Sequence, residues 1–260
     1  PGRYPIQRAM VAAGLVPGPL PPSVTPDEWM KRLGALPLVH QPGDRWMYHT
    51  GSDVIGVLLT RATGQSLEDL FRERIFEPLG MTDTSFHVPA SKLHRLPPTY
   101  TANPATGALE VHDDPRQSRW SRPPLFESCG GGLVSTADDY LAFCQMLLNG
   151  GRCGSEQILS RSSVELMTTD QLAPEQKEGA DIFLGEHRGW GFGMAVQTGA
   201  DEVAAVPGRF GWDGGTGTSA YSDPHEGLVG ILLTQRLMES PEAPPVFVDF
   251  WAAAYQAIDG

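Results

Sequence analysis

The stretch GRFGWDGGTGTSAYSDP, residues 208–224, carries the strongest indication of the fold. It holds five glycines and one tryptophan, and an apolar run follows shortly after it. An Asp-Gly pair between two strands favours a tight hairpin turn, because both central positions of that turn take positive φ. One hairpin needs only one or two glycines. The excess therefore indicates that another group approaches this backbone closely.

The same stretch does not match the common nucleotide-binding motifs. A phosphate loop requires a lysine after its second glycine, and no lysine lies near the glycines here. The dinucleotide motif GxGxxG fails because Ala220 stands where the third glycine belongs. HExxH and GxSxG do not occur in the chain, which argues against a helix-borne zinc protease site and a nucleophile elbow.

Composition is typical of one acidic globular domain. The 260 residues are 40% hydrophobic and 19% charged, and the formal net charge is -12. This charge argues against nucleic acid and anionic membrane surfaces as partners, since both require a cationic surface. No apolar run approaches the roughly 18 residues of a membrane span. Three cysteines without a CxxC pair suggest neither disulfides nor a zinc site, and no metal or cofactor is indicated.

Helical periodicity predominates before residue 185. Residues 1–45 are rich in Pro and Gly with one helical candidate, and residues 87–127 are interpreted as a loop or small excursion. The expected caps are Thr25, Ser66, and Ser135 or Thr136. Together with a closing helix, the predicted helical segments are residues 25–36, 51–64, 66–80, 135–151, 160–169 and 244–258.

Strand patterns follow residue 185. Short runs rich in aromatic and branched residues, separated by turn residues, are predicted as antiparallel strands at 188–198, 217–224 and 227–236. Helices, then an antiparallel meander, then a covering helix make an α+β layout in a single domain. Within it we expect a variable N-terminal stretch (1–37), a mainly helical and loop region (38–184), and antiparallel strands with a C-terminal helix (185–260).

A second informative segment is QPGDRWMYHTGSDVIGVLL, residues 41–59. It places Tyr48 at a loop-to-helix junction, with Thr50 or Ser52 marking the helix start. A tyrosine at such a junction is usually structural, with a packed ring and a hydroxyl bonded to backbone. The segment alone therefore leaves a structural and a catalytic role open.

Taken together, residues 42–86, 130–151 and 211–224 resemble the serine β-lactamase and penicillin-binding-protein superfamily. The likeness is greatest to the branch that holds class C β-lactamases, D-aminopeptidases and related carboxylesterases, and it runs from about residue 38 to the C-terminus. It implies a β-lactamase/DD-peptidase-like fold, an antiparallel sheet flanked by helices with a helical subregion. The resemblance also implies that the sheet is incomplete at its N-terminus, with an unpaired edge that favours aggregation or pairing with a partner.

The resemblance assigns roles to several residues. Tyr48 is similar to the motif tyrosine that, with a lysine, activates the nucleophilic serine. Trp212, Asp213 and Gly214 fall where the family carries a Lys-Thr-Gly-like triplet beside the substrate. The amide of Gly215 then resembles the oxyanion donor of that strand.

Two departures from the family pattern bear on the substrate. His49 and Thr50 follow Tyr48 where the motif ends in Asn, and both are expected beside the substrate. Trp212 replaces the cation that would hold the carboxylate of a β-lactam or peptide. An uncharged ester is therefore the predicted substrate, with an amide as the other small-molecule possibility.

A third departure concerns the nucleophile. No serine has a lysine three positions later, because Glu28, Pro89 and Pro174 precede the three lysines at that spacing. A serine needs such a base to attack. We expect the Ser-x-x-Lys element on a segment or companion chain absent from these 260 residues. The complete protein is then predicted to be a carboxylesterase that acts through an acyl-enzyme. The alternative is a non-catalytic binding or scaffold protein that has lost the nucleophile.

Overall fold

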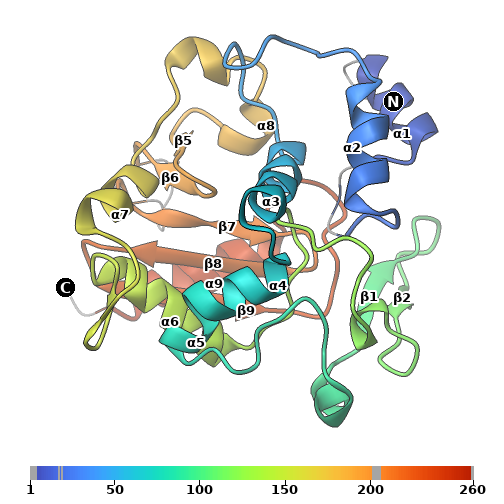
Figure 1. Ribbon diagram of the computed structural model, residues 1–260. Helices are drawn as coiled ribbons and strands as arrows, with labels where there is room; N and C mark the ends of the chain where they lie inside the picture. The colour runs from blue at the N-terminus through green and yellow to red at the C-terminus, as the bar shows by residue number, and fades with distance from the viewer. Residues whose placement is uncertain (1–4, 17, 19, 201–205, 259–260) are drawn as a thin grey trace.

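A five-stranded antiparallel sheet forms the centre of the computed structural model, which describes residues 5–16, 18, 20–200 and 206–258 (Figure 1). Its strands follow one another in chain order, so each hairpin joins direct neighbours. The strands of this sheet are β5 (Arg188–Trp190), β6 (Ala195–Gln197), β7 (Phe210–Gly214), β8 (Thr218–Asp223) and β9 (Leu228–Leu233).

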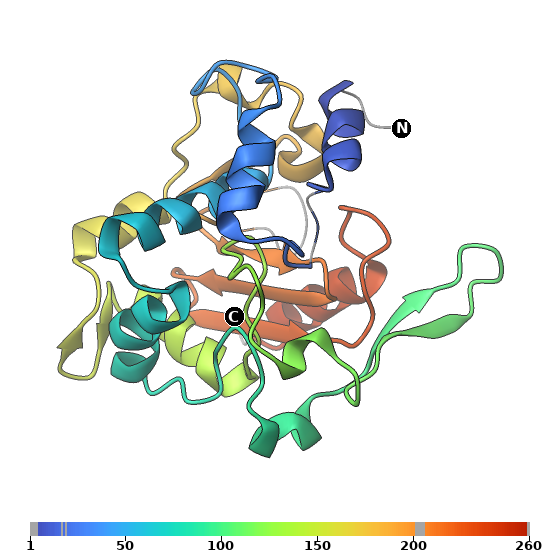
Figure 2. The same ribbon diagram turned by 45° about the vertical axis from the view of Figure 1, so that its right-hand side comes forward.

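Helices cover this sheet and extend away from it on the N-terminal side (Figures 1 and 2). The α-helices are α1 (Pro5–Ala13), α2 (Pro26–Gly34), α3 (Thr50–Thr63), α4 (Leu67–Phe71), α5 (Glu77–Leu79), α6 (Ala137–Leu148), α7 (Arg161–Met167), α8 (Asp181–Leu184) and α9 (Pro245–Gln256). A π-helical turn, η1 (Arg72–Phe76), joins α4 to α5, and short 3₁₀ turns are η2 (Ala90–Arg95), η3 (Arg119–Ser121) and η4 (Pro174–Lys177). The α+β class expected from the sequence is confirmed.

The expected caps hold at three helices. The side chains of Thr25, Ser66 and Thr136 accept hydrogen bonds from backbone amides in the first turns of α2, α4 and α6. Each satisfies an amide that has no partner inside its helix. At α3 the start falls at Thr50, but its N-cap residue is His49 and no side chain caps it.

The two faces of the sheet have different neighbours. Successive strand residues point to opposite faces, so Phe210 and Trp212 of β7 share one face and Asp213 lies on the other. Phe210 packs in a core cluster with Met146 and other side chains of the helical region. On the opposite face, Trp251 of α9 donates a hydrogen bond from Nε1 to the Oγ of Ser219 at 2.9 Å. Trp212 therefore faces the helical region.

The excess of glycine in the opening stretch is explained by close backbone approaches. A Cβ at Gly211 would lie 2.2 Å from the Ala220 carbonyl oxygen. At Gly217, where φ is +92°, it would lie 2.0 Å from the Arg236 carbonyl oxygen. The chain turns at residues 215–217 rather than at Asp-Gly, because Asp213 and Gly214 still belong to β7. A hairpin turn with Asp-Gly at its two central positions therefore does not form.

Four further differences from the sequence expectations concern short elements. Helix α1 was not expected, and residues 188–198 form two strands with a turn between them rather than one. The region expected to be loop holds a hairpin of β1 (Thr99–Ala102) and β2 (Leu109–Asp113), which projects from the body in both views (Figures 1 and 2). A further small pair is β3 (Arg152–Cys153) with β4 (Glu156–Gln157). In each case the strand or helix is shorter than the window that reveals periodicity.

Membrane-spanning segments were also sought in the structure. Among its described residues, no helix combines the length and apolar character that crossing a bilayer requires.

Candidate active site

A hydrogen bond joins Tyr48 to Trp212, which are 164 positions apart in the sequence. The indole Nε1–H of Trp212 donates to the phenol Oη of Tyr48 at 2.6 Å. Tyr48 stands two residues before α3, and Trp212 lies in the middle of β7. Folding therefore brings together the two residues that the sequence marks most clearly.

The protonation of Tyr48 follows from its surroundings. Burial raises the pKa of its phenol above the ordinary value of 10.0. The hydrogen bond from Trp212 acts in the opposite direction, while the Asp213 carboxylate raises the pKa further. The phenol is therefore protonated near neutral pH. Because its oxygen accepts from Trp212, its own hydrogen is available to another acceptor.

Five aromatic rings meet around this pair, and we call them the five-ring cluster. Their members come from the Tyr48 loop, α8, β5 and β7, and are Trp46, Tyr48, Phe183, Trp190 and Trp212. The ring centroids of Tyr48 and Phe183 are 4.8 Å apart, as are those of Trp190 and Trp212. All five side chains are half-buried, so each keeps part of its surface accessible.

Asp213 points away from this cluster. Its Oδ1 accepts a hydrogen bond from the hydroxyl of Ser219 at 2.6 Å and its Oδ2 accepts one from Tyr221 at 3.2 Å. Burial raises the pKa of the carboxyl, and both hydrogen bonds lower it. The Arg209 guanidinium lies over the rings of Tyr221 and Trp251 on the same face. The structure thus places Asp213 in a polar group under α9, across the sheet from Tyr48.

The two glycines after Asp213 end the strand. Gly214 is the last residue of β7, and a Cβ there would lie 2.3 Å from the Thr218 Oγ1. Gly215 begins the turn, where its carbonyl accepts a hydrogen bond from the Met238 amide at 3.0 Å. The backbone at this end of β7 is therefore tightly packed and ordered by neighbours on both sides.

His49 and Thr50 lie directly after the tyrosine. The His49 Nε2 is 3.1 Å from the carbonyl oxygen of Gly18, and its ring lies against Gly130. Its Nδ1 is buried, with no hydrogen-bond partner among the described residues. Thr50 is the first residue of α3. His49 thus connects the tyrosine loop to the N-terminal stretch and to the loop before α6.

The tyrosine loop is also fastened to η4. The Arg45 guanidinium pairs with the Glu178 carboxylate, and the Trp46 amide donates to the Gln176 carbonyl at 2.8 Å. The side-chain amide of Gln176 donates back to the Gly43 carbonyl at 2.7 Å. These contacts hold Trp46 and Tyr48 in place relative to the segment that carries Phe183.

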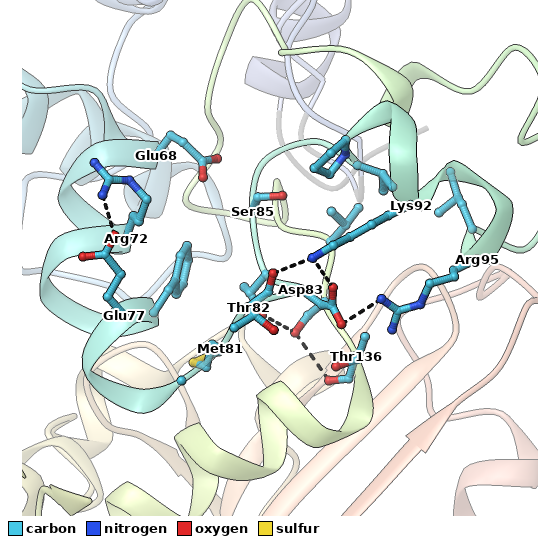
Figure 3. Close-up of a pocket in the computed structure, with 18 of the residues that line it drawn as sticks. Glu68, Arg72, Glu77, Met81, Thr82, Asp83, Ser85, Lys92, Arg95 and Thr136 are labelled. Carbon is cyan, nitrogen blue, oxygen red and sulfur yellow. Dashed lines mark hydrogen bonds and ion pairs between the residues drawn. The ribbon is translucent and has the colours of Figure 1, made fainter.

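A cavity of about 600 Å³ lies elsewhere, between the α4–α5 turns and η2 (Figure 3). It shares no lining residue with the five-ring cluster. Lys92 and Arg95 approach Asp83 from one side, at 2.5 and 2.8 Å, and these cations hold the pKa of the Asp83 carboxyl below its usual value. On the other side Arg72 pairs with a glutamate. These charged groups lining the cavity pair with one another.

Candidate metal ligands do not gather at either place. Among the described residues, no group of three or more His, Cys, Asp or Glu side chains could hold a metal ion.

Comparison with known proteins identifies the family of the chain. The family model described as Beta-lactamase matches residues 10–248. The chain belongs to the β-lactamase family. This family member is 38% identical over 245 residues to Protein Rv1367c of Mycobacterium tuberculosis, which covers 90% of this chain and 58% of that protein. It is 30% identical over 235 residues to Esterase EstB of Burkholderia gladioli, covering 84% of this chain and 56% of the esterase.

A solved structure extends the likeness to three dimensions. EstCE1, described as a hydrolase with promiscuous acyltransferase activity, superimposes on this β-lactamase-family chain with a TM-score of 0.80 at 25% identity. The match covers 98% of this chain and 67% of EstCE1. The chain therefore spans a little over half the length of the curated relatives named above.

Sequence reasoning missed three members of the five-ring cluster, Trp46, Phe183 and Trp190. Trp46 lies inside the quoted segment 41–59 and Trp190 inside the predicted strand 188–198, but no residue pattern singles out these rings or Phe183. One signal was present: three of the six tryptophans of this β-lactamase-family chain belong to the cluster.

Proposed function

We propose that the polypeptide containing this chain is a serine hydrolase that cleaves small uncharged carboxylic esters through an acyl-enzyme. The hydrogen bond from Trp212 to Tyr48 carries the proposal. It sets a polarised phenol beside an indole, at a position where a cation would instead attract a substrate carboxylate. The esterase and hydrolase names of the relatives support the same reaction class.

The nucleophilic serine and its lysine are assigned to a segment outside these 260 residues. Two observations support this assignment. No serine of the chain has a lysine three positions later, and the relatives that the chain matches are considerably longer. A serine brought beside Tyr48 by such a segment gains the base that it needs for attack.

Tyr48 acts as a proton shuttle in this proposal. When the serine oxygen attacks the ester carbonyl, its proton passes to the Tyr48 oxygen while the phenol proton passes to the departing alkoxide. The alcohol leaves and an acyl-enzyme remains. Water then attacks the acyl carbonyl, and the same oxygen takes the water proton as it returns one to the serine. The hydrogen bond from Trp212 stabilises the negative charge that develops on the phenol oxygen.

The end of β7 contributes the surroundings of the reacting carbonyl. The Gly215 amide is proposed to donate to the oxyanion, which a preformed backbone donor stabilises without reorganisation. Gly214 keeps this backbone free of a side chain. Thr50, two residues after the shuttle, is proposed to contact the substrate, and His49 to fix the loop that carries both.

The test uses the full natural polypeptide. A fluorophosphonate probe should label one serine, and mass spectrometry should locate it outside the segment described here. Tyr48→Phe should lower kcat/KM for ester hydrolysis by about 10²–10⁴-fold with the fold retained. Tyr100→Phe, on the projecting hairpin, should behave as wild type. Absence of a labelled serine would refute the hydrolase and favour a non-catalytic protein, whereas undiminished turnover in Tyr48→Phe would refute the shuttle.

A further inference from the structure

The five-ring cluster presents more aromatic surface than the reaction itself requires. Tyr48 needs one partner for its oxygen, and Trp212 supplies it. Phe183, Trp190 and Trp46 add three further rings, all half-buried. Large aromatic side chains that stay partly accessible in one place mark a binding surface more often than a folding core.

Exposed apolar residues lie on the same segments as the cluster. Met47 is 46% exposed, Ile182 is 55% exposed and Phe192 is 55% exposed. Each lies within two residues of a member of the cluster, on the tyrosine loop, on α8 and after β5. The segments that carry the cluster therefore expose further apolar side chains.

Two ion pairs lie beside the segments that carry the cluster. The Asp170 carboxylate, which accepts the Trp190 amide at 3.0 Å, binds the Lys177 ammonium at 2.5 Å. The Glu178 carboxylate binds Arg45. Asp213 lies across the sheet. Among the described residues, Arg209 is a cation stacked on aromatic rings, and it too lies on the α9 face. The five rings of the cluster themselves thus carry no charge.

The segment that carries Phe183 is held rigidly. Two backbone hydrogen bonds from Phe183 and Leu184 to the Ala180 carbonyl form the α8 turn, and the Arg45–Glu178 pair and the Gln176 contacts tie the preceding turn to the tyrosine loop. A preorganised wall loses little conformational entropy when a ligand packs on it. The Phe183 ring, whose centroid lies 4.8 Å from that of Tyr48, is therefore carried by a segment tied to the tyrosine loop.

We infer that the five-ring cluster is a recognition wall for a bulky, uncharged, apolar group of the substrate, with Phe183 as a specificity-determining residue. The inference deepens the proposed function and rests on it for the ester bond. The group that packs on the wall is the one next to the ester bond, such as a branched alkyl or aryl group. Such a group loses water-exposed surface on the rings, whereas a charged group of the same shape would lose hydration on rings that carry no charge.

The kinetic test compares acetate esters with the full natural polypeptide. The esters of 3,3-dimethylbutanol and of choline have nearly the same shape but differ in charge, and ethyl acetate lacks the bulky group. The dimethylbutyl ester should have the highest kcat/KM, by about tenfold or more over the other two. Phe183→Ala should reduce the ratio of dimethylbutyl to ethyl ester by about fivefold, mainly through KM, and Phe183→Leu by less. Leu166→Ala, an exposed change on α7, should keep the wild-type ratio.

A binding test separates this inference from the proposed reaction. The ketones 6,6-dimethylheptan-2-one and trimethyl(4-oxopentyl)ammonium mimic the two bulky esters and cannot be hydrolysed. The neutral ketone should quench tryptophan fluorescence with the lower Kd, and Phe183→Ala should weaken it. Binding of the neutral ketone without any ester turnover would refute the hydrolase and support the recognition wall. Preference for the choline ester and its ketone would overturn the wall in favour of a cation–π site. Equal kcat/KM values for all three esters would overturn the inference too.

Discussion

Trp212 and Asp213 are neighbours in the chain, yet their side chains lie on opposite faces of β7 and influence the same phenol. Trp212 donates directly to the Tyr48 oxygen, while Asp213 is held by Ser219 and Tyr221 beneath α9 and acts on Tyr48 through its charge. Their effects on the Tyr48 pKa are opposite in sign. Strand alternation therefore lets adjacent positions act on one phenol from opposite faces of the sheet.

Replacing Trp212 by Phe should raise the Tyr48 pKa. The change removes the hydrogen bond that stabilises the phenolate and leaves the burial of the ring nearly unchanged. Ultraviolet titration of the tyrosines should show one group moving to higher pH, and kcat for esters should fall by about tenfold, the worth of one hydrogen bond in the transition state. Trp120→Phe, on η3, serves as the matched control. A Tyr48 titration that does not move would contradict the assignment of the 2.6 Å contact.

Replacing Asp213 by Asn should lower the Tyr48 pKa. A carboxylate disfavours a second negative charge nearby, so its removal makes ionisation of the phenol easier. The same titration should move one tyrosine to lower pH, opposite to the Trp212→Phe result. Where activity declines at high pH because Tyr48 ionises, that decline should begin at lower pH in Asp213→Asn. A shift in the same direction as Trp212→Phe would show that the charge of Asp213 does not reach the phenol.

The Asp213 carboxyl should also give stability its own pH dependence. Burial raises its folded pKa above the ordinary value of 3.8, so the folded state binds the proton more tightly than the unfolded state. This contribution is fully present below pH 3.8 and is lost as the pH rises through the folded pKa. Across this pH window, the free energy of unfolding measured with denaturant should therefore fall more in the wild type than in Asp213→Asn. Identical slopes for the two proteins would contradict the raised pKa.

Gly217→Ala should destabilise the fold strongly. The added Cβ would lie 2.0 Å from a carbonyl oxygen at a residue whose φ is +92°, so both sterics and backbone oppose it. Urea unfolding should show a loss of about 2–4 kcal/mol. Gly227→Ala is the control, because its φ is +63° with nothing within 4 Å of the new Cβ. It should cost about 1 kcal/mol. Equal costs would mean that the close approach at Gly217 has no energetic weight.

Ser219→Ala should destabilise the fold through the polar group under α9. The Ser219 side chain is fully buried; its hydroxyl donates to Asp213 and accepts from Trp251. Its removal leaves two buried polar groups short of a partner, which costs about 1–3 kcal/mol in unfolding free energy. Ser162→Ala, at an exposed position of α7, should change stability by less than about 0.5 kcal/mol. If Ser219→Ala is as mild as this control, the network is not supporting β7.

Local features of the chain determined much of the fold. The caps at Thr25, Ser66 and Thr136 and the periodic stripes between them depend on residues within a few positions of one another, and these helices form where the sequence places them. The class of the fold and the family followed from the order of such segments, and the family model confirms the latter. The division of residues 188–198 into β5 and β6 and the hairpin of β1 and β2 were missed because pairing, rather than periodicity, defines them.

For the candidate site, the sequence singled out Tyr48 and Trp212 but gave no distance between them. Only the tertiary structure brings their polar atoms to 2.6 Å and gathers Trp46, Phe183 and Trp190 around them. It also turns Asp213 under α9, away from the face where its neighbour lies. Caps and periodicity are short-range and can be read along the chain. Contacts between rings on separate loops and strands depend on how the whole chain packs, and no local pattern encodes them.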